Sequence, residues 1–309
     1  MEKLENMVRE SKAMITTASD FKLLLEQSMD IVKTPPRNSK YYKPGIIELG
    51  ENDGYFFIGD IHGDFYGLLS VLKMMWEKLN EGYFVIFLGD YIDRGYMQLE
   101  TLSLVLTLKN ELRDQVVLMR GNHEPAKWLI PYPHDYPDTL RSRYGSAWRE
   151  LYELSLKFFN ELTLACILEG HFISVHGGPP LSIINANTWR DAFYVDRESM
   201  PGKELEIILW SDPIDLDIDH APSPRGAGVL YGLKVTEKAL RLINGKYVIR
   251  GHEAVNGIST SHGNKVYTVF TSPLVYGLSY AGMIEYNRDS YTGDYKLVRH
   301  LVKPIGGFD

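Results

Sequence analysis

The chain has 309 residues, of which 44% are hydrophobic, and this is enough apolar material for one large domain with a substantial core. Its formal net charge of −7 argues against a general nucleic-acid-binding protein, which would carry a basic surface. A single cysteine, Cys166, excludes an internal disulfide, and neither a signal peptide nor a membrane-spanning apolar run is present, so we expect a cytoplasmic protein without membrane contact.

The first 33 residues have the spacing of a helix. Apolar side chains recur there at three- and four-residue steps, at Phe21, Leu24, Leu25, Met29 and Ile31–Val32. Pro35 and Pro36 end this segment, because proline cannot donate a hydrogen bond into a helix. We therefore expect residues 1–44 to form a helical extension whose apolar face packs on the domain formed by residues 45–309, rather than binding a partner.

Beyond residue 45, short apolar runs each end in a polar cluster that contains glycine. The runs are Tyr55–Ile58, Tyr83–Leu88, Val116–Met119, Phe172–Val175 and Tyr247–Ile249. Helical stretches are expected between them, at 64–80, 98–112 and 137–162. From about residue 265 the pattern predicts strands only, at Lys265–Thr271, Met283–Asn287 and Tyr295–Val302. We therefore predict an α/β fold (α+β in some schemes) in which two packed sheets form a central β-sandwich flanked by helices.

The polar clusters at the predicted strand ends are rich in metal-ligating side chains. In α/β folds, ligand sites lie just beyond the carboxyl ends of the strands. The side chains at these ends are Asp60, His62, Asp90, Asn122, His123, His176 and His252. Aspartate, histidine and asparagine without a thiolate suit ions such as Mn²⁺, Fe²⁺ or Zn²⁺. They are too many for one tetrahedral ion and instead suit two ions that share a carboxylate.

Taken singly, each cluster also has an ordinary structural explanation. Asn122 and its neighbours would serve as a helix cap, and His176 and His252 would serve as hydrogen-bonded core histidines. However, five such clusters occur in order along the chain, each after a predicted strand and each beside glycine. Their joint occurrence favours the metal site.

These clusters resemble the motifs of the metal-dependent serine/threonine phosphoprotein phosphatases, the PPP family within the calcineurin-like metallophosphoesterases. The resemblance runs from about residue 45 to 285. Its motifs are Gly59–Gly63, Gly89–Gly95, Arg120–Glu124, His176–Gly178, Leu209–Pro213 and Arg225–Gly226. The resemblance implies a metallophosphoesterase-like fold with residues 45–309 as the catalytic domain.

The resemblance also implies a role for each site residue. Asp60, His62 and Asp90 would hold a first metal ion, and Asp90 would bridge to a second ion held by Asn122, His176 and His252. His123 would protonate the leaving alkoxide, and Asp93 would orient His123 by a hydrogen bond. Arg94 and Arg225 would clamp the phosphate oxygens, because the guanidinium fork matches phosphate geometry.

The implied activity is hydrolysis of phosphoserine and phosphothreonine in proteins by in-line attack of a metal-bridging hydroxide. Two divalent ions would be required, and Mn²⁺ is expected in preference to Fe, Zn or Mg. The partners would be phosphorylated proteins or peptides together with a regulatory subunit. Two alternatives remain open. One is a small-molecule metallophosphoesterase, such as a dinucleoside-polyphosphate hydrolase or a nucleotidase. The other is a binding or scaffold protein with a degenerate site, against which the complete set of ligands, acid and arginines argues.

Two segments differ from the amino-acid sequence that is usual in the family. In Thr271–Gly277, the family tyrosine that lies beside the substrate phosphate falls on Val275, and Tyr276 replaces a cysteine. Either Tyr276 takes over the missing role or the role is absent. Segment 125–138, rich in proline and aromatic residues, borders the predicted site and would reshape the substrate groove.

Overall fold

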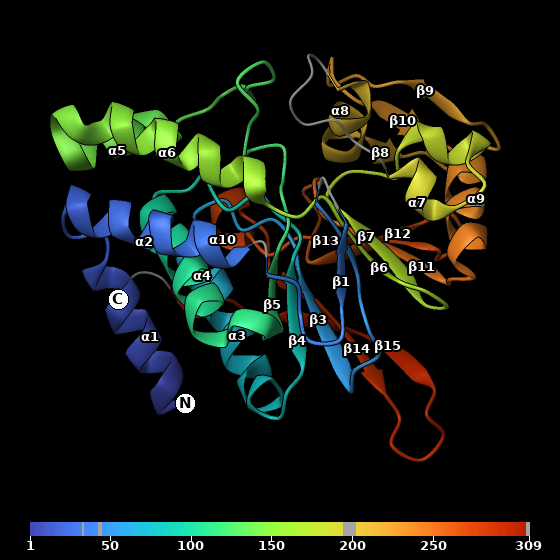
Figure 1. Cartoon of the computed structure of the whole chain (residues 1–309), viewed down its shortest axis with the longest axis horizontal. Coiled ribbons are helices and arrows are strands. Elements are labelled where there is room, and N and C mark those ends of the chain that lie inside the picture. The colour runs from blue at the N-terminus through green and yellow to red at the C-terminus, as the bar shows by residue number, and fades with distance from the viewer. Residues whose placement is uncertain (33, 43–44, 194–201, 307–309) are drawn as a thin grey trace.

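The computed structural model describes residues 1–32, 34–42, 45–193 and 202–306, and within these ranges it consists of two packed sheets with helices outside them (Figure 1). One sheet has five strands in the order β15-β14-β3-β4-β5. Its strands are β3 (Gly54–Ile58), β4 (Phe84–Phe87), β5 (Val116–Leu118), β14 (Ala281–Arg288) and β15 (Tyr295–Val302). Strands β3, β4 and β5 run parallel, and β14 and β15 join them as an antiparallel hairpin.

The other large sheet has seven described strands in the order β1-β2-β6-β7-β11-β13-β12. They are β1 (Lys40–Tyr42), β2 (Ile46–Glu48), β6 (Ala165–Leu168), β7 (Phe172–Val175), β11 (Tyr247–Arg250), β12 (Ile258–Ser261) and β13 (Val266–Val269). A small described sheet contains β8 (Asp212–Pro213), β10 (Val229–Tyr231) and β9 (His220–Pro222).

The strand sequences explain why the two sheets pack face to face. In β3, Tyr55 and Phe57 point into the cluster between the sheets, whereas Phe56 and Ile58 point to the helices on the outer face. Successive side chains of a strand point to opposite faces, so a continuous apolar run covers both faces of its sheet. Phe172 of the other sheet meets Phe57 edge to face, with ring centroids 5.0 Å apart. The predicted central β-sandwich flanked by helices is confirmed.

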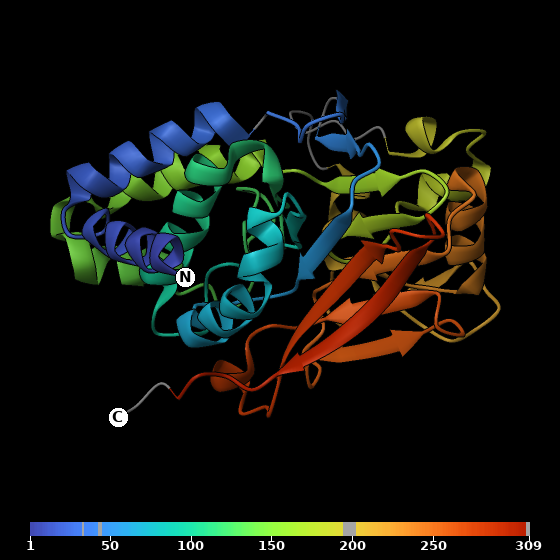
Figure 2. The same cartoon turned by 90° about the horizontal axis from the view of Figure 1, so that it is seen from below.

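Helices cover the outer faces of both sheets. Next to the five-stranded sheet lie α3 (Phe65–Asn80), α4 (Gln98–Leu112), α5 (Tyr136–Tyr144) and α6 (Trp148–Glu161). On the far side of the seven-stranded sheet lie α7 (Trp189–Ala192), α8 (Lys203–Trp210) and α9 (Leu233–Ile243). Figure 2 shows these two groups of helices at opposite ends of the molecule. Among the described residues, no helix is long and apolar enough to cross a membrane.

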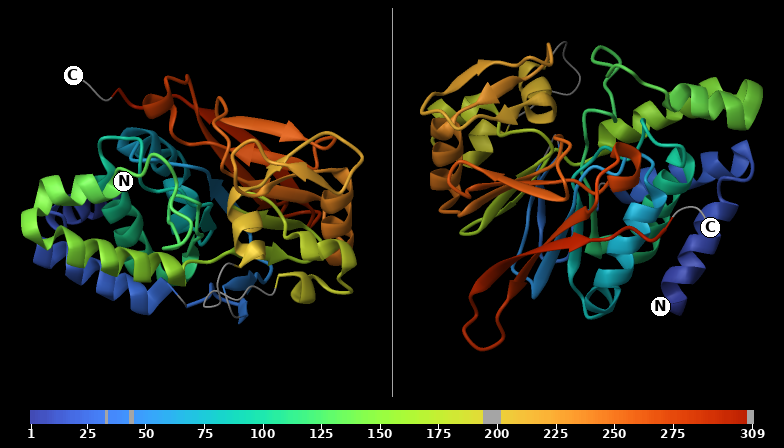
Figure 3. Two further views of the ribbon diagram at one scale, coloured as in Figure 1. Left: turned by 90° about the horizontal axis from the view of Figure 1, so that it is seen from above. Right: turned by 180° about the vertical axis from the view of Figure 1, so that it is seen from behind.

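The N-terminal segment forms two helices, not a single helical run. They are α1 (Glu2–Ala13) and α2 (Ala18–Val32), and the chain turns between them. Helix α1 packs beside α4, and α2 packs beside both α4 and α6 (Figure 3). Phe21 stacks on Tyr144 with ring centroids 5.8 Å apart, and the hydroxyl of Ser103 donates to the Ser11 carbonyl at 2.7 Å.

Two other element predictions are wrong in detail. The helix expected over 137–162 is divided into α5 and α6, because Gly145 takes a φ of +55° and a short 3₁₀ turn, Gly145–Ala147, separates them. The strand-only pattern after residue 265 is interrupted by a four-residue helix, α10 (Pro273–Tyr276), which begins at proline, a residue suited to the first helical position. This short helix lies between β13 and β14, within segment Thr271–Gly277, whose sequence differs from that usual in the family.

Candidate metal centre

The predicted ligands come together where strands of the two sheets end. Asp60 and His62 follow β3, Asp90 follows β4, and Asn122 follows β5. His176 follows β7 and His252 follows β11 in the other sheet. Every one of these side chains is buried, with no more than 7% of the residue exposed. The sandwich therefore brings six polar side chains into one enclosed region.

The backbone at the site is held in an unusual conformation. Among the described residues, His62, Asp90, Asp93, Arg94 and His252 have positive φ values of 47°, 56°, 65°, 74° and 74°. Such conformations cost roughly 1–3 kcal/mol each and persist where the surroundings fix them. Here the amides of Ile61 and His62 both donate to the Asp90 carbonyl, at 2.9 Å each, which ties the β3 loop to the β4 loop.

Glycines let the carboxylates approach the neighbouring backbone. A Cβ on Gly121 would collide with the Asp90 carboxylate, and a Cβ on Gly251 would collide with that of Asp60. At these two positions, the glycine of the sequence motif therefore provides the space that the carboxylate needs.

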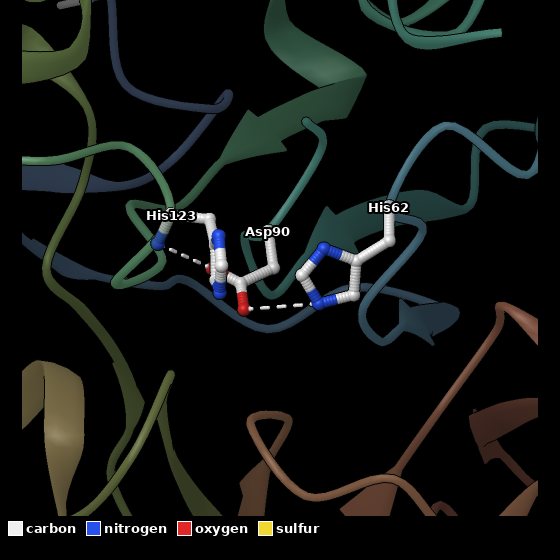
Figure 4. A group of neighbouring side chains, drawn as sticks. All are labelled: His62, Asp90 and His123. Carbon is white, nitrogen blue, oxygen red and sulfur yellow. Dashed lines mark hydrogen bonds and ion pairs between the residues drawn. The ribbon is translucent and has the colours of Figure 1, made fainter. Parts of the chain in front are cut away.

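The first group of candidate ligand atoms includes Asp90 and His62, and Figure 4 shows Asp90 between the rings of His62 and His123. Oδ2 of Asp90 lies 3.4 Å from Nε2 of His62, and Oδ2 of Asp60 lies 3.9 Å from the same nitrogen. Nδ1 of His62 lies 2.8 Å from the Ile92 carbonyl, so the ring proton is on Nδ1 and Nε2 is free to coordinate. Burial lowers the pKa of His62 to about 4, which keeps the imidazole neutral, as a metal ligand must be.

The second group shares the same Asp90 oxygen. Nε2 of His176 lies 3.4 Å from Asp90 Oδ2 and 3.0 Å from Oδ1 of Asn122, and Nδ1 of His252 lies 2.9 Å from that Asn122 oxygen. The other ring nitrogen of His176 lies 2.8 Å from the Leu88 carbonyl, which fixes the ring. Asp90 Oδ2 is thus equally distant from a histidine of each group.

The donor set fits two divalent ions. Coordinating atoms of His62, Asp90 and His123 lie within 4.8 Å of one another, as do those of Asp90, His176 and His252. Burial and the neighbouring Asp90 charge raise the pKa of Asp60 to about 7, because two buried carboxylates repel each other without a cation between them. A cation at the point where these oxygen and nitrogen atoms converge would therefore stabilise the site.

His123 lies beside this cluster and is tied to Asp93. Nδ1 of His123 lies 2.6 Å from Asp93 Oδ2, and the His123 amide donates to Asp90 Oδ1 at 2.8 Å. Burial alone would lower the pKa of His123, but the charge of Asp90 and the hydrogen bond to Asp93 outweigh it and raise the pKa. The ring lies 4.7 Å from that of His62. The structure therefore places an imidazole that can carry a proton against the predicted metal ligands.

The two predicted clamp arginines lie on opposite sides of the cluster. Arg94 is near His123, and the Arg94 side chain hydrogen-bonds Tyr276. Nε of Arg225 lies 2.5 Å from Asp212 Oδ2, and the buried Arg250 binds the other Asp212 oxygen at 2.9 Å. Asp212 Oδ1 is also 3.9 Å from Nε2 of His252, which has no hydrogen-bond partner among the described residues. Arg225 therefore lies on the Nε2 side of His252, whereas the Nδ1 atom of His252 faces Asn122.

Segment Thr271–Gly277, which differs from the usual family sequence, places Tyr276 and not Val275 beside the predicted metal ligands. The ring of Tyr276 lies 5.7 Å from that of His62 and 4.9 Å from that of Phe270. Burial and the charge of Asp60 raise the pKa of Tyr276 to about 12, so its hydroxyl remains a donor. Val275 instead lines a mostly apolar pocket of about 580 Å³, which Arg94 also lines.

Sequence reasoning missed two residues that support the site. The buried Glu124 accepts hydrogen bonds from the amides of Asp90, Tyr91 and Gly121, at 2.8 to 3.0 Å, and so joins two of the loops. His134 lies 2.8 Å from the same Asp93 oxygen as His123. Glu124 was inside a recognised motif, whereas His134 had no signal beyond its place in the atypical segment 125–138.

Comparisons with known sequences agree with this geometry. Residues 55–256 match the sequence profile of the family described as calcineurin-like phosphoesterase. The chain is 36% identical over 220 residues to the serine/threonine-protein phosphatase 6 catalytic subunit of Drosophila melanogaster, covering 70% of this chain and 69% of the relative. It is 33% identical over 217 residues to the serine/threonine-protein phosphatase ppe1 of Schizosaccharomyces pombe, covering 70% and 68%.

Solved structures show the same fold. A protein serine/threonine phosphatase from Saccharomyces cerevisiae, described as similar to human phosphatase PP5, aligns with a TM-score of 0.76 at 22% identity, covering 94% of this chain and 91% of the other. A cold-active protein-tyrosine phosphatase of a Shewanella species aligns with a TM-score of 0.56 at 17% identity, covering 84% and 82%.

Proposed function

This chain belongs to the calcineurin-like phosphoesterases and, among them, to the serine/threonine phosphoprotein phosphatases, and on that premise we propose that it hydrolyses phosphoserine and phosphothreonine in proteins with two bound divalent ions. The observation that carries the proposal is the position of Asp90, whose Oδ2 lies 3.4 Å from a histidine nitrogen of each ligand group. An oxygen shared in this way suits a pair of ions.

The proposed ligand sets follow the two groups of side chains. Asp60, His62 and Asp90 would hold one ion, and Asp90, Asn122, His176 and His252 would hold the other. Bound ions of this kind polarise the phosphoryl group and supply a water-derived nucleophile near neutral pH. We propose Mn²⁺ as the ion, because the oxygen- and nitrogen-rich donor set suits it.

The chain's own side chains would bind the phosphate and move the proton. His123 would give the proton on its outward nitrogen, Nε2, to the departing serine oxygen, while Nδ1 stays bonded to Asp93 at 2.6 Å. Arg94 and Arg225 would bind the phosphate oxygens and balance their charge. The hydroxyl of Tyr276, which hydrogen-bonds Arg94, would contact the phosphate from the position that Val275 leaves vacant.

We further propose that residues 45–309 form the catalytic domain and that residues 1–44 are an extension packed on it. Leu4 and Phe21 belong to the same buried cluster as Leu104 of α4 and Phe158 of α6, which supports packing over a role in binding a partner. Phosphorylated proteins or peptides are the proposed partners, together with a regulatory subunit.

A substrate panel tests the proposed function. Initial rates should be measured for a phosphoserine peptide, a phosphotyrosine peptide, p-nitrophenyl phosphate, a phosphodiester and diadenosine tetraphosphate, each with added Mn²⁺ and again with a chelator. We expect turnover of the phosphoserine peptide that the chelator abolishes and fresh Mn²⁺ restores. A preference for the dinucleotide would instead establish a small-molecule metallophosphoesterase, and metal-replete inactivity on every ester would indicate a scaffold protein.

A further inference from the structure

Segment 125–138 brings a second imidazole to the carboxylate that holds His123. Oδ2 of Asp93 lies 2.6 Å from Nδ1 of His123 and 2.8 Å from Nδ1 of His134. The other oxygen, Oδ1, accepts from the amides of Asp135 and Tyr136 at 3.0 and 2.9 Å. A carboxylate offers about four acceptor positions, so these four donors from the described residues fill them.

The orientation of His134 is fixed from its far side. Its Nε2 lies 3.0 Å from the hydroxyl of Tyr152 on α6, and only 6% of the His134 side chain is exposed. Burial raises the pKa of Tyr152 to about 12, so the hydroxyl keeps its proton. A tyrosine that donates to Nε2 leaves the ring proton of a neutral His134 on Nδ1, which faces Asp93. Tyr152, His134, Asp93 and His123 therefore form one chain of hydrogen bonds.

Both imidazoles stabilise the ionised form of Asp93. Burial would raise the pKa of Asp93, but the hydrogen bonds from His123 and His134 outweigh it and hold the pKa well below its usual range. Without His134, one acceptor position of Oδ2 would be empty in a region that excludes water, because Asp93 is fully buried. The carboxylate could then turn toward another donor and take His123 with it.

We propose that His134 is a positioning residue for the general acid: by sharing the Asp93 carboxylate and being braced by Tyr152, it fixes the direction in which His123 presents its proton. The inference rests on the proposed function, since His123 needs a leaving group to protonate. It gives segment 125–138 a task inside the site. A partner that orients a functional imidazole is worth about 10–100-fold in activity when it is removed.

The dependence on the leaving group separates positioning from a structural role. For His134→Ala with saturating Mn²⁺, we expect kcat on a phosphoserine peptide to fall about 10-fold or more, with KM changed less than about threefold. On p-nitrophenyl phosphate the loss should be at most about threefold, since that leaving group needs little protonation. His134→Asn should recover most of the activity, because its side-chain amide can donate to Asp93 from a position near that of Nδ1.

A pair of tyrosine variants provides a matched control. Tyr152→Phe removes the hydroxyl at Nε2 of His134, whereas Tyr144→Phe removes a hydroxyl that donates to the Ile15 carbonyl, also at 3.0 Å. Both are in the same pair of helices, and each change removes one oxygen atom. We expect Tyr152→Phe to lower kcat selectively for the phosphoserine peptide and Tyr144→Phe to leave the ratio between the two substrates unchanged. If His134→Ala does not fold, this pair of variants still tests whether His134 positions His123.

A second readout does not depend on turnover. In metal-free protein, proton NMR should show low-field resonances for the Nδ1 protons of His123 and His134, and His134→Ala should both remove one and shift the other. Equal losses on the two substrates, an unchanged rate on the phosphoserine peptide or an unshifted His123 resonance would overturn the inference while the proposed function stands. Wild-type protein inactive on both esters would overturn the two together.

Discussion

The two sides of the candidate metal centre hold the side chains proposed to act there in opposite ways. His123 is buried, and it is bonded to a carboxylate, Asp93, that accepts four hydrogen bonds from described residues. Arg225 is tied to one carboxylate, Asp212, and 36% of its side chain is exposed. The proton transfer proposed for His123 requires fixed alignment, whereas a partly exposed guanidinium has room to adjust to the phosphate oxygens. Hydrogen bonding is therefore densest on the side of His123, the proposed acid side.

Backbone conformation shows the same contrast. Four of the positive-φ site residues, His62, Asp90, Asp93 and Arg94, lie in the β3 and β4 loops on the acid side, and only His252 lies across from them. At roughly 1–3 kcal/mol each, these conformations require dense hydrogen bonding to persist. Glu124 and the paired amides of Ile61 and His62 supply it. The acid side is therefore preorganised at a cost in stability.

Removing the carboxylate shared by both sides should have the largest effect. Asp90→Asn takes a negative charge from both ligand groups, so we expect metal affinity to fall by more than about 100-fold, since loss of an outer partner alone costs about 10–100-fold. Metal content after dialysis, measured by atomic emission, checks this. Asp138→Asn, which alters an exposed ion pair with Arg141, is the control. Unchanged metal content in Asp90→Asn would contradict the shared-ligand assignment.

The acid side alone is tested by His123→Asn. We expect kcat on a phosphoserine peptide to fall about 10²–10⁴-fold, because general acid catalysis contributes that much, while p-nitrophenyl phosphate loses far less. Metal content should stay at the wild-type level. The exposed His220 offers the control variant His220→Asn. Normal turnover of the phosphoserine peptide, an alkyl ester, by His123→Asn would show that His123 is not the general acid.

The opposite side is tested by Arg225→Lys. The change keeps the charge and loses the guanidinium fork, so we expect KM to rise about 10-fold with a smaller change in kcat, equivalent to one charged hydrogen bond. Steady-state kinetics on the phosphoserine peptide measures this, with Arg141→Lys on α5 as the control. A kcat loss as large as that of His123→Asn would erase the proposed contrast between a rigid acid and an adaptable clamp.

The smallest effect is expected from Tyr276→Phe. The loss of a single hydrogen bond costs about 1 kcal/mol, so kcat/KM should fall roughly fivefold. Tyr96→Phe is the control, because Tyr96 is 99% exposed on the same side of the site. Indistinguishable kinetics for the two variants would mean that the role of the family tyrosine is absent from this chain.

Much of the site could be predicted because its residues occur in short motifs. A motif such as Gly59–Gly63 carries its own strand end, glycine and ligand types, so the local sequence reveals the chemistry. His134 could not be found in this way. It is 41 residues from Asp93 along the chain, and only the packing of α5 and α6 brings the two together. The position of Tyr276 likewise depends on α10, a helix too short to show a period in sequence.

The fold class, the family and the types of candidate ligand could be predicted from the amino-acid sequence, because strand periodicity and glycine-flanked polar clusters are local properties. Which atoms meet depends on the three-dimensional packing of the chain. It placed one Asp90 oxygen 3.4 Å from His62 and from His176, two histidines carried by different sheets. It also set Arg225 against Asp212 and gave His123 a carboxylate shared with a second imidazole. Such distances follow from how sheets and helices pack, and packing joins residues that no sequence window contains.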